Sequence, residues 1–208
     1  MSGVQVKICG ITREADALAA ARLGADALGF NFWPRSRRYL PPEAAAPIVA
    51  ALPPHVLPVG VLVDPTPEEL LHAIAASGVR AVQLHGDEPP ALCQAVPVPV
   101  VKGIRVRDAH SLAQLASYEV AGFLLDSATP GYGGSGTAFD WSLAAEAAAS
   151  VRVWLAGGLT PENVGEAVRR VRPHGVDVAS GVESAPGVKD LAKVEAFIRN
   201  AKAAAAGP

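Results

Sequence analysis

The sequence contains few of the residues that build disulfide frameworks or metal clusters. Only two cysteines, Cys9 and Cys93, occur in 208 residues, and they lie far apart in the chain. This excludes a disulfide-rich fold and gives no zinc-ligand spacing, so we expect a reducing, cytoplasmic environment and no metal. Because two thiols cannot form a framework, each needs its own explanation.

Long apolar runs and an excess of one charge are also missing. No stretch is apolar enough to span a bilayer, and we see no secretory signal at the start. Lys and Arg number 18 against 20 Asp and Glu, a formal net charge of −2. The one tight basic cluster, Arg35, Arg37 and Arg38, is too small for a nucleic-acid footprint. We therefore expect neither a nucleic acid nor a membrane as partner.

The sequence instead alternates short β-rich runs with amphipathic stretches rich in Ala and Leu. The expected strands are residues 4–9, 27–32, 57–63, 81–86, 99–105, 122–127, 151–158 and 176–181. The expected helices are residues 13–24, 41–53, 66–78, 89–97, 108–118, 140–150, 160–172 and 189–204. Such alternation is typical of βαβ units and a parallel sheet.

Eight units predict an α/β protein with a single-domain (β/α)8 TIM barrel over residues 1–208. The doubly wound alternative usually has a Gly-rich dinucleotide turn after its first strand, and CGITRE (9–14) is not that turn. Active sites on the barrel lie at the C-terminal ends of the strands. Polar residues at those ends are therefore the candidates for function.

Glycines at the C-terminal ends of the last two expected strands indicate a phosphate site. LAGGLT contains Gly157 and Gly158, and VASGVE contains Ser180 and Gly181. Backbone N–H groups at such turns bind an anion without Lys or Arg, and barrels usually bind phosphate there. Tight βα turns would explain either pair alone, but two pairs on successive strands favour a phosphosugar ligand.

Cys9 is the last residue of the first expected strand and Asp126 lies near the end of the sixth, so they can face each other across a small ligand as an acid/base pair. The simpler alternatives are a buried small hydrophobe for Cys9 and a helix cap or loop-ordering residue for Asp126. Lys7 shares a strand face with Cys9, and we expect its ammonium to lower the pKa of the thiol. Cys93 lies on an expected helix and is assigned to packing.

Other strand-end residues are candidate ligands. The fork of Arg38 suits a substrate carboxylate, although a solvated charge run explains it equally well. His85 is interpreted as an acid, a base or a donor to the substrate, with a residue that holds its own loop as the alternative, and Gln83 and Asp177 complete the set. The glycine-rich segment 127–141 is predicted to be a lid, with an ordinary surface loop as the alternative.

Six motifs resemble those of the phosphoribosylanthranilate isomerase family of tryptophan biosynthesis. They are VKICGIT, GADALGFNFWPRSRRYL, AVQLHGDE, LLDSATPGYGGSGTAFDW, LAGGLTPENV and VDVASGVE, and they follow one another in order from residue 4 to about residue 200. The chain departs from the common pattern at Ala156 and Ala179, where many members have serine.

The resemblance implies an intramolecular oxidoreductase without metal or cofactor. It would convert the phosphosugar N-(5-phosphoribosyl)anthranilate to 1-(2-carboxyphenylamino)-1-deoxyribulose 5-phosphate, with Asp126 as general acid and Cys9 as general base. Arg38 would bind the anthranilate carboxylate. The remaining expected substrate-binding residues are Lys7, Gln83, His85, Gly157, Gly158, Asp177, Ser180 and Gly181. Whether the protein is a monomer or a homodimer is left open.

Other readings remain possible for the sequence alone. A histidine-pathway isomerase performs the same rearrangement but usually has aspartate where this chain has Cys9. Indole-glycerol-phosphate synthase needs a catalytic lysine and glutamate that we do not locate. A ribulose-phosphate epimerase needs histidines and metal ligands at strand ends. Four histidines of this chain lie elsewhere, namely His55, His72, His110 and His174. An inactive barrel that serves as a binding module is the alternative from another class.

Overall fold

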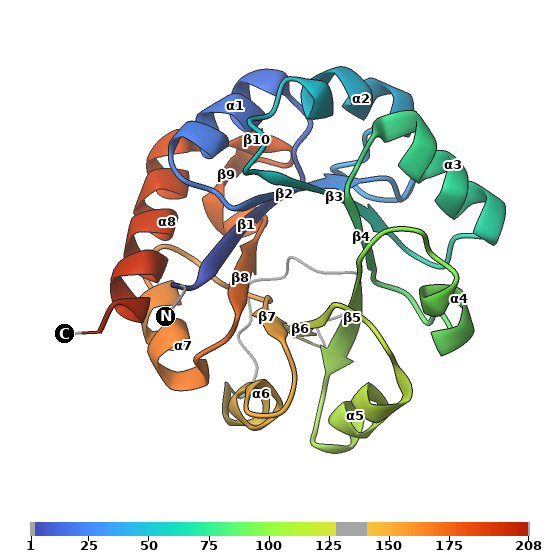
Figure 1. Ribbon diagram of the computed structural model, residues 1–208. Coiled ribbons are helices and arrows are strands. Elements are labelled where there is room, and N and C mark those ends of the chain that lie inside the picture. The colour runs from blue at the N-terminus through green and yellow to red at the C-terminus, as the bar shows by residue number, and fades with distance from the viewer. Residues whose placement is uncertain (1–2, 128–140, 208) are drawn as a thin grey trace.

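The computed structural model describes residues 3–127 and 141–207, and its eight parallel strands close into a barrel (Figure 1). In order round the barrel these are β1 (Gln5–Cys9), β2 (Ala27–Asn31), β3 (Leu57–Leu62), β4 (Ala81–Leu84), β5 (Val100–Val106), β6 (Gly122–Ser127), β7 (Val153–Leu155) and β8 (Gly175–Val178). Pairing of β1 with β8 closes the ring and sets Lys7 opposite Asp177. The predicted (β/α)8 fold is confirmed.

Helices surround the barrel, one after each strand (Figure 1). They are α1 (Glu14–Arg22), α2 (Pro42–Ala50), α3 (Pro67–Ser77), α4 (Pro90–Gln94), α5 (His110–Ala113), α6 (Trp141–Ala148), α7 (Val164–Val171) and α8 (Leu191–Ala205). The helix expected over 108–118 is wrong in detail, because α5 has four residues and continues as the 3₁₀ turn η1 (Gln114–Ser117). Within the described ranges, no helix combines the length and apolar character needed to cross a membrane.

Signals in the sequence explain where these helices begin and end. The Thr66 hydroxyl accepts a hydrogen bond from the Glu69 amide, and the Glu69 carboxylate accepts one from the Thr66 amide, which is the expected capping box of α3. Gly78 ends α3 with a φ of 72°, in the left-handed conformation. Asp190 caps α8 by accepting from two amides of its first turn.

Two apolar clusters hold the layers together. The larger joins strands to helices and includes the fully buried Phe30, Leu70 and Phe197. The smaller consists of strand side chains inside the ring together with Ala156, and its other members are Ala27, Val59, Ala81, Leu124 and Trp154. Because apolar side chains fill the barrel interior, a ligand site must lie at one end of the barrel.

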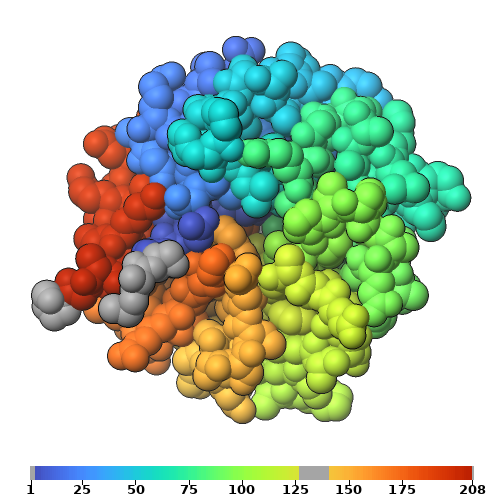
Figure 2. All heavy atoms as spheres, viewed as in Figure 1, coloured from blue at the N-terminus to red at the C-terminus, as the bar shows by residue number. Residues whose placement is uncertain are grey.

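A short hairpin that the sequence did not reveal follows β8. After the 3₁₀ turn η2 (Ser180–Val182), β9 (Glu183–Ala185) pairs antiparallel with β10 (Val188–Lys189), and α8 comes next. Figure 1 places this hairpin beside β1 and α1. In the space-filling view, the early (blue) and late (red) parts of the chain lie side by side on the rim (Figure 2). The hairpin therefore lies where the last quarter of the chain meets the first strand and helix.

Candidate active site

One pocket lies at the C-terminal ends of the strands, and almost all of the predicted site residues line it. The predicted residues in its lining are Cys9, Arg38, Gln83, His85, Asp126, Gly157, Gly158, Asp177, Ser180 and Gly181. Lys7 is not among the lining residues, and Ser36 and Val61 are lining residues that were not predicted. The fold thus brings the candidates together, whereas their individual roles stay predictions.

Cys9, the last residue of β1, is buried against β2. A Cβ atom at Gly29 would lie 2.7 Å from the Cys9 sulfur and 3.1 Å from the Lys7 nitrogen, so glycine leaves space for both side chains. Burial raises the pKa of the Cys9 thiol, and the cations of Lys7 and Lys189 oppose this only in part. The expectation that Lys7 leaves the thiol with a lowered pKa is therefore wrong, because desolvation outweighs the attraction.

Lys7 is a fixed cation inside the barrel. Its amine donates to Oδ1 of Asp177 at 2.8 Å and to Oε1 of Gln83 at 2.9 Å. Burial disfavours its charge, but the carboxylate of Asp177 and the thiol of Cys9 outweigh burial, and the pKa of Lys7 is raised. Contact between Lys7 and a substrate stays a prediction, since other side chains already engage its amine.

A chain of hydrogen bonds that begins at Lys7 fixes the tautomer of His85. An ammonium only donates, so the Gln83 atom facing Lys7 is Oε1, and Nε2 of Gln83 lies 2.8 Å from Nδ1 of His85. Because an amide nitrogen also only donates, Nδ1 accepts and the neutral ring carries its proton on Nε2. That nitrogen lies 3.5 Å from Oδ2 of Asp126.

Asp126 presents a buried carboxyl group near the end of β6. Its side chain is 7% exposed, and its Oδ1 has no hydrogen-bond partner among the described residues. Space for the neighbouring His85 ring depends on Gly103 of β5, because a Cβ atom there would lie 2.9 Å from the ring. A buried carboxyl with an unpaired oxygen, in the wall of a pocket, is suited to proton transfer with a ligand.

The loops after β7 and β8 have the backbone that the phosphate hypothesis requires. Gly157 and Gly158 have φ values of 83° and 65°, a left-handed conformation that favours glycine. Their amides make no hydrogen bond to other described residues. A Cβ atom at Gly181 would collide with the carbonyl oxygen of Leu159, so the two loops lie directly against each other. Two adjacent loops thus offer backbone donors to an anion.

Arg38 reaches the pocket from the loop after β2, but it already has a partner that was not predicted. Its Nε and Nη2 donate to the Glu183 carboxylate at 2.8 and 2.6 Å. A Cβ atom at Gly10, whose φ is 77°, would overlap the Arg38 side chain. Sequence reasoning missed Glu183 and Lys189, and the only signal was the acidic residue that closes the VASGVE motif.

Two further expectations concern the lid and the metal. The predicted lid spans residues 127–141, of which 128–140 lie outside the described residues, so it stays a prediction. Across 3–127 and 141–207, no group of three or more His, Cys, Asp or Glu side chains is arranged to hold a metal ion.

Comparison with known proteins identifies relatives of the whole chain. A family model described as "N-(5'phosphoribosyl)anthranilate (PRA) isomerase" matches residues 6–200. The N-(5'-phosphoribosyl)anthranilate isomerase of Myxococcus xanthus is 53% identical over 204 residues, which cover 96% of this chain and 96% of that protein.

Solved structures give the same result. Phosphoribosyl anthranilate isomerase from Thermotoga maritima has a TM-score of 0.92 and 47% identity, covering 96% of this chain and 99% of that one. A structure of such an isomerase with reduced 1-(o-carboxyphenylamino)-1-deoxyribulose 5-phosphate has a TM-score of 0.88, 43% identity and the same coverage. A third, described as monomers of the dimeric Thermotoga maritima enzyme, has a TM-score of 0.87 and 42% identity, covering 96% and 99%.

Proposed function

The chain belongs to the N-(5'-phosphoribosyl)anthranilate isomerase family of tryptophan biosynthesis, and we propose that its pocket isomerises this aminoaldose by general acid/base catalysis. The reaction is an Amadori rearrangement to 1-(2-carboxyphenylamino)-1-deoxyribulose 5-phosphate, a phosphosugar whose reduced form is bound in one solved relative. The observation that carries the mechanism is that Cys9 and Asp126 line one pocket together with the glycine loops.

Asp126 acts as the general acid. Its protonated carboxyl gives a proton to the ribose ring oxygen, the C1′–O bond breaks, and the open sugar forms an iminium with the anthranilate nitrogen. The buried Oδ1 without a hydrogen-bond partner among the described residues supports this assignment, because that oxygen is available to a ligand. His85 then faces the other oxygen of the carboxyl group.

Cys9 acts as the general base. Its thiolate removes the proton from C2′, and the electron pair moves toward the iminium nitrogen to give an enolamine. Burial favours the neutral thiol in the free enzyme, so the thiol first releases its proton to solvent, and the nearby iminium then favours the thiolate while substrate is bound. The thiol then returns a proton to C1′ while the enol oxygen loses its proton to Asp126, so both groups end as they began. The iminium is itself the electron sink, and this sequence of steps therefore uses no cofactor.

The two charged ends of the substrate have separate partners. The amides of Gly157, Gly158, Ser180 and Gly181 bind the phosphate, and Arg38 binds the anthranilate carboxylate. Gln83 and Asp177 also lie in the lining, where they can contact the sugar hydroxyls. A cytoplasmic location and a monomeric or homodimeric state are further expectations, and a dimeric relative is known.

Turnover of the aminoaldose tests the proposal. Anthranilate and phosphoribosyl pyrophosphate would form the labile substrate in situ with the preceding transferase, and its decay would be followed by anthranilate-type fluorescence. Fast enzyme-dependent decay that is lost in Cys9→Ser is the expected result. Decay at the uncatalysed rate with the wild type would refute the proposed activity, and the histidine-pathway aminoaldose would then be the next substrate to assay.

A further inference from the structure

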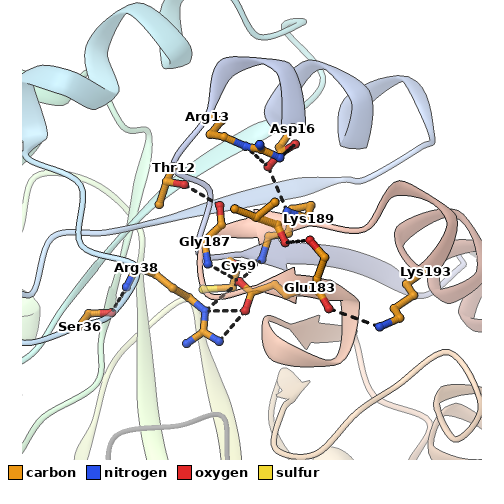
Figure 3. Close-up of polar contacts among 12 residues, drawn as sticks. Cys9, Thr12, Arg13, Asp16, Ser36, Arg38, Glu183, Gly187, Lys189 and Lys193 are labelled. Carbon is orange, nitrogen blue, oxygen red and sulfur yellow. Dashed lines mark hydrogen bonds and ion pairs between the residues drawn. The ribbon is translucent and has the colours of Figure 1, made fainter.

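The hairpin of β9 and β10 is tied to the segment that carries Cys9 (Figure 3). Thr12 donates from its hydroxyl to the carbonyl oxygen of Gly187 at 2.6 Å, and the Lys189 amide donates to the Asp16 carboxylate at 3.1 Å. In each of these two hydrogen bonds, the donor and the acceptor lie more than one hundred residues apart in the chain. These bonds hold the hairpin against the segment that follows β1.

Glu183 lies at the centre of this contact and accepts hydrogen bonds from three residues (Figure 3). Besides two N–H groups of Arg38, its carboxylate accepts from the Lys189 amine at 2.8 Å and from the Gly187 amide at 3.2 Å. The Lys189 side chain is fully buried and that of Glu183 is 5% exposed. A buried ion pair is weak evidence for stability, so its role must be sought in what it orients.

The geometry at Arg38 leaves one edge of the guanidinium for a ligand. Glu183 engages the Nε and Nη2 side of the group, whereas Nη1 has no hydrogen bond to any described residue. A guanidinium has five N–H donors and can hold two carboxylates on two different edges. Since Arg38 lines the pocket, its second edge is available to a substrate carboxylate.

Lys189 provides the second link, to Cys9. Its amine donates to the carbonyl oxygen of Cys9 at 2.6 Å while it holds Glu183 at 2.8 Å. The buried ammonium of Lys189 thus connects the backbone of Cys9 to the carboxylate of Glu183, which in turn orients Arg38. Figure 3 shows the four residues grouped together, with Cys9 beside Arg38 and with Glu183 and Lys189 next to them.

We propose that Glu183 and Lys189 are positioning residues that set the distance and angle between the carboxylate-binding edge of Arg38 and the thiol of Cys9. The proposal rests on the proposed function for the identity of the substrate carboxylate. Glu183 acts through Arg38 and therefore affects binding of the carboxylate end. Lys189 acts through its hydrogen bond to the Cys9 backbone and through the positive charge of its own ammonium. It therefore affects the proton-transfer step.

A binding experiment tests the role of Glu183 without requiring turnover. The ligands are reduced 1-(o-carboxyphenylamino)-1-deoxyribulose 5-phosphate and its aniline analogue, which lacks the ring carboxylate. Glu183→Gln is expected to weaken the carboxylate ligand about tenfold, the weight of one charge-assisted hydrogen bond, and the analogue less than about twofold. Glu166→Gln is the matched control, because Glu166 forms an exposed ion pair with Arg170 on α7.

A double-mutant cycle tests whether Glu183 acts through Arg38. In the Arg38→Ala background, Glu183→Gln should weaken carboxylate binding by less than about twofold, because the group through which it acts is gone. Equal losses for both ligands, no loss for either, or full additivity with Arg38→Ala would each overturn the role of Glu183. Wild-type protein that binds the ligand but does not turn over substrate would refute the proposed function alone.

Lys189 is tested by the pH dependence of kcat/KM. The charged groups that interact electrostatically with the Cys9 thiol are Lys7, Asp177, Lys189 and Arg38. Lys189→Met removes one cation and should move the rise of kcat/KM to higher pH and lower kcat about threefold, a size typical of one orienting contact. Lys189→Arg should restore the profile of the wild type. An unshifted profile in a folded Lys189→Met protein would overturn this half of the proposal.

Discussion

The amine of Lys7 lies 2.9 Å from Oε1 of Gln83, and this contact sets the hydrogen-bonding role of a histidine that Lys7 does not touch. Gln83 has to turn its amide nitrogen toward His85, so Nε2–H of the imidazole faces the Asp126 carboxyl group. Through Gln83, the buried cation therefore sets which ring nitrogen of His85 carries the proton, and that nitrogen lies 3.5 Å from the candidate acid. Such a chain can be interrupted without changing any side-chain volume.

Gln83→Glu is the isosteric test of this chain. A carboxylate would still accept from Lys7 but could not donate to Nδ1 of His85, so the ring must protonate or exchange its tautomer. We expect kcat to fall about tenfold, because the histidine beside the acid changes its tautomer or its charge, and KM to change less, although Gln83 also lines the pocket. Steady-state kinetics measures this, with Gln114→Glu on the exposed η1 turn as the control. An unchanged kcat would show that the tautomer has no role.

Cys9→Ser should abolish proton abstraction and leave binding largely intact. A hydroxyl is a far weaker base than a thiolate, and loss of a general base costs roughly 100-fold or more in kcat. Cys93→Ser is the matched control, because Cys93 is also buried but lies on α4 away from the pocket. Pre-steady-state and steady-state turnover with binding of the reduced product would separate the two effects. Near-normal kcat in Cys9→Ser would exclude Cys9 as the base.

Asp126→Asn should give an equally large loss of kcat at a different step. An amide cannot donate the proton that opens the ring, so the aminoaldose should bind but remain in its closed form. Its volume is nearly that of aspartate, and thermal unfolding should therefore change little. Turnover of the variant within about tenfold of the wild type would contradict the assignment, because general-acid catalysis contributes more than that.

The fold could be predicted because each of its elements has a recognisable pattern in its own stretch of sequence. Each barrel strand has its own β-rich run and each helix has its own amphipathic stretch, and the eight expected strands agree with β1 to β8 except at their ends. The expected strand 151–158 shortens to Val153–Leu155, because Ala156 and Gly157 already belong to the loop that forms the pocket. Placing polar residues at strand ends then located the pocket.

The contacts within the site could not be predicted in the same way. The Arg38–Glu183 pair joins residues 145 positions apart, and no local pattern records such a pairing. The segment 183–189 is too short for alternation to reveal a hairpin, and it contains a proline and a glycine. The pKa of Cys9 was also predicted in the wrong direction, because the sequence shows the neighbouring Lys7 but not the burial of the thiol.

The raised pKa of Cys9 predicts the pH dependence of its alkylation. In Cys93→Ser protein, the rate with iodoacetamide should rise with pH and reach half of its maximum above 9.0, the ordinary thiol value. The folded protein favours the neutral thiol, so the corresponding stability is present below the ordinary value and is lost as pH rises through the raised pKa. A midpoint at or below 9.0 would contradict the dominance of burial.

Gly10→Ala should weaken substrate binding because it displaces the Arg38 side chain, in addition to straining the backbone. Gly10 and Gly24 both have left-handed φ values, 77° and 97°, so alanine should cost about 1 to 2 kcal/mol of stability at either position. At Gly10 the new Cβ atom would also overlap the Arg38 side chain, whereas at Gly24 the nearest atoms lie 3.8 Å away.

The two variants therefore form a matched pair. Both should lower the melting temperature, but only Gly10→Ala should raise KM, by about fivefold or more, because it displaces the side chain proposed to hold the substrate carboxylate. Parallel thermal unfolding and steady-state kinetics would measure both properties. Equal KM values in the two variants would mean that Arg38 can leave its position without affecting the substrate, and its proposed role would then be wrong.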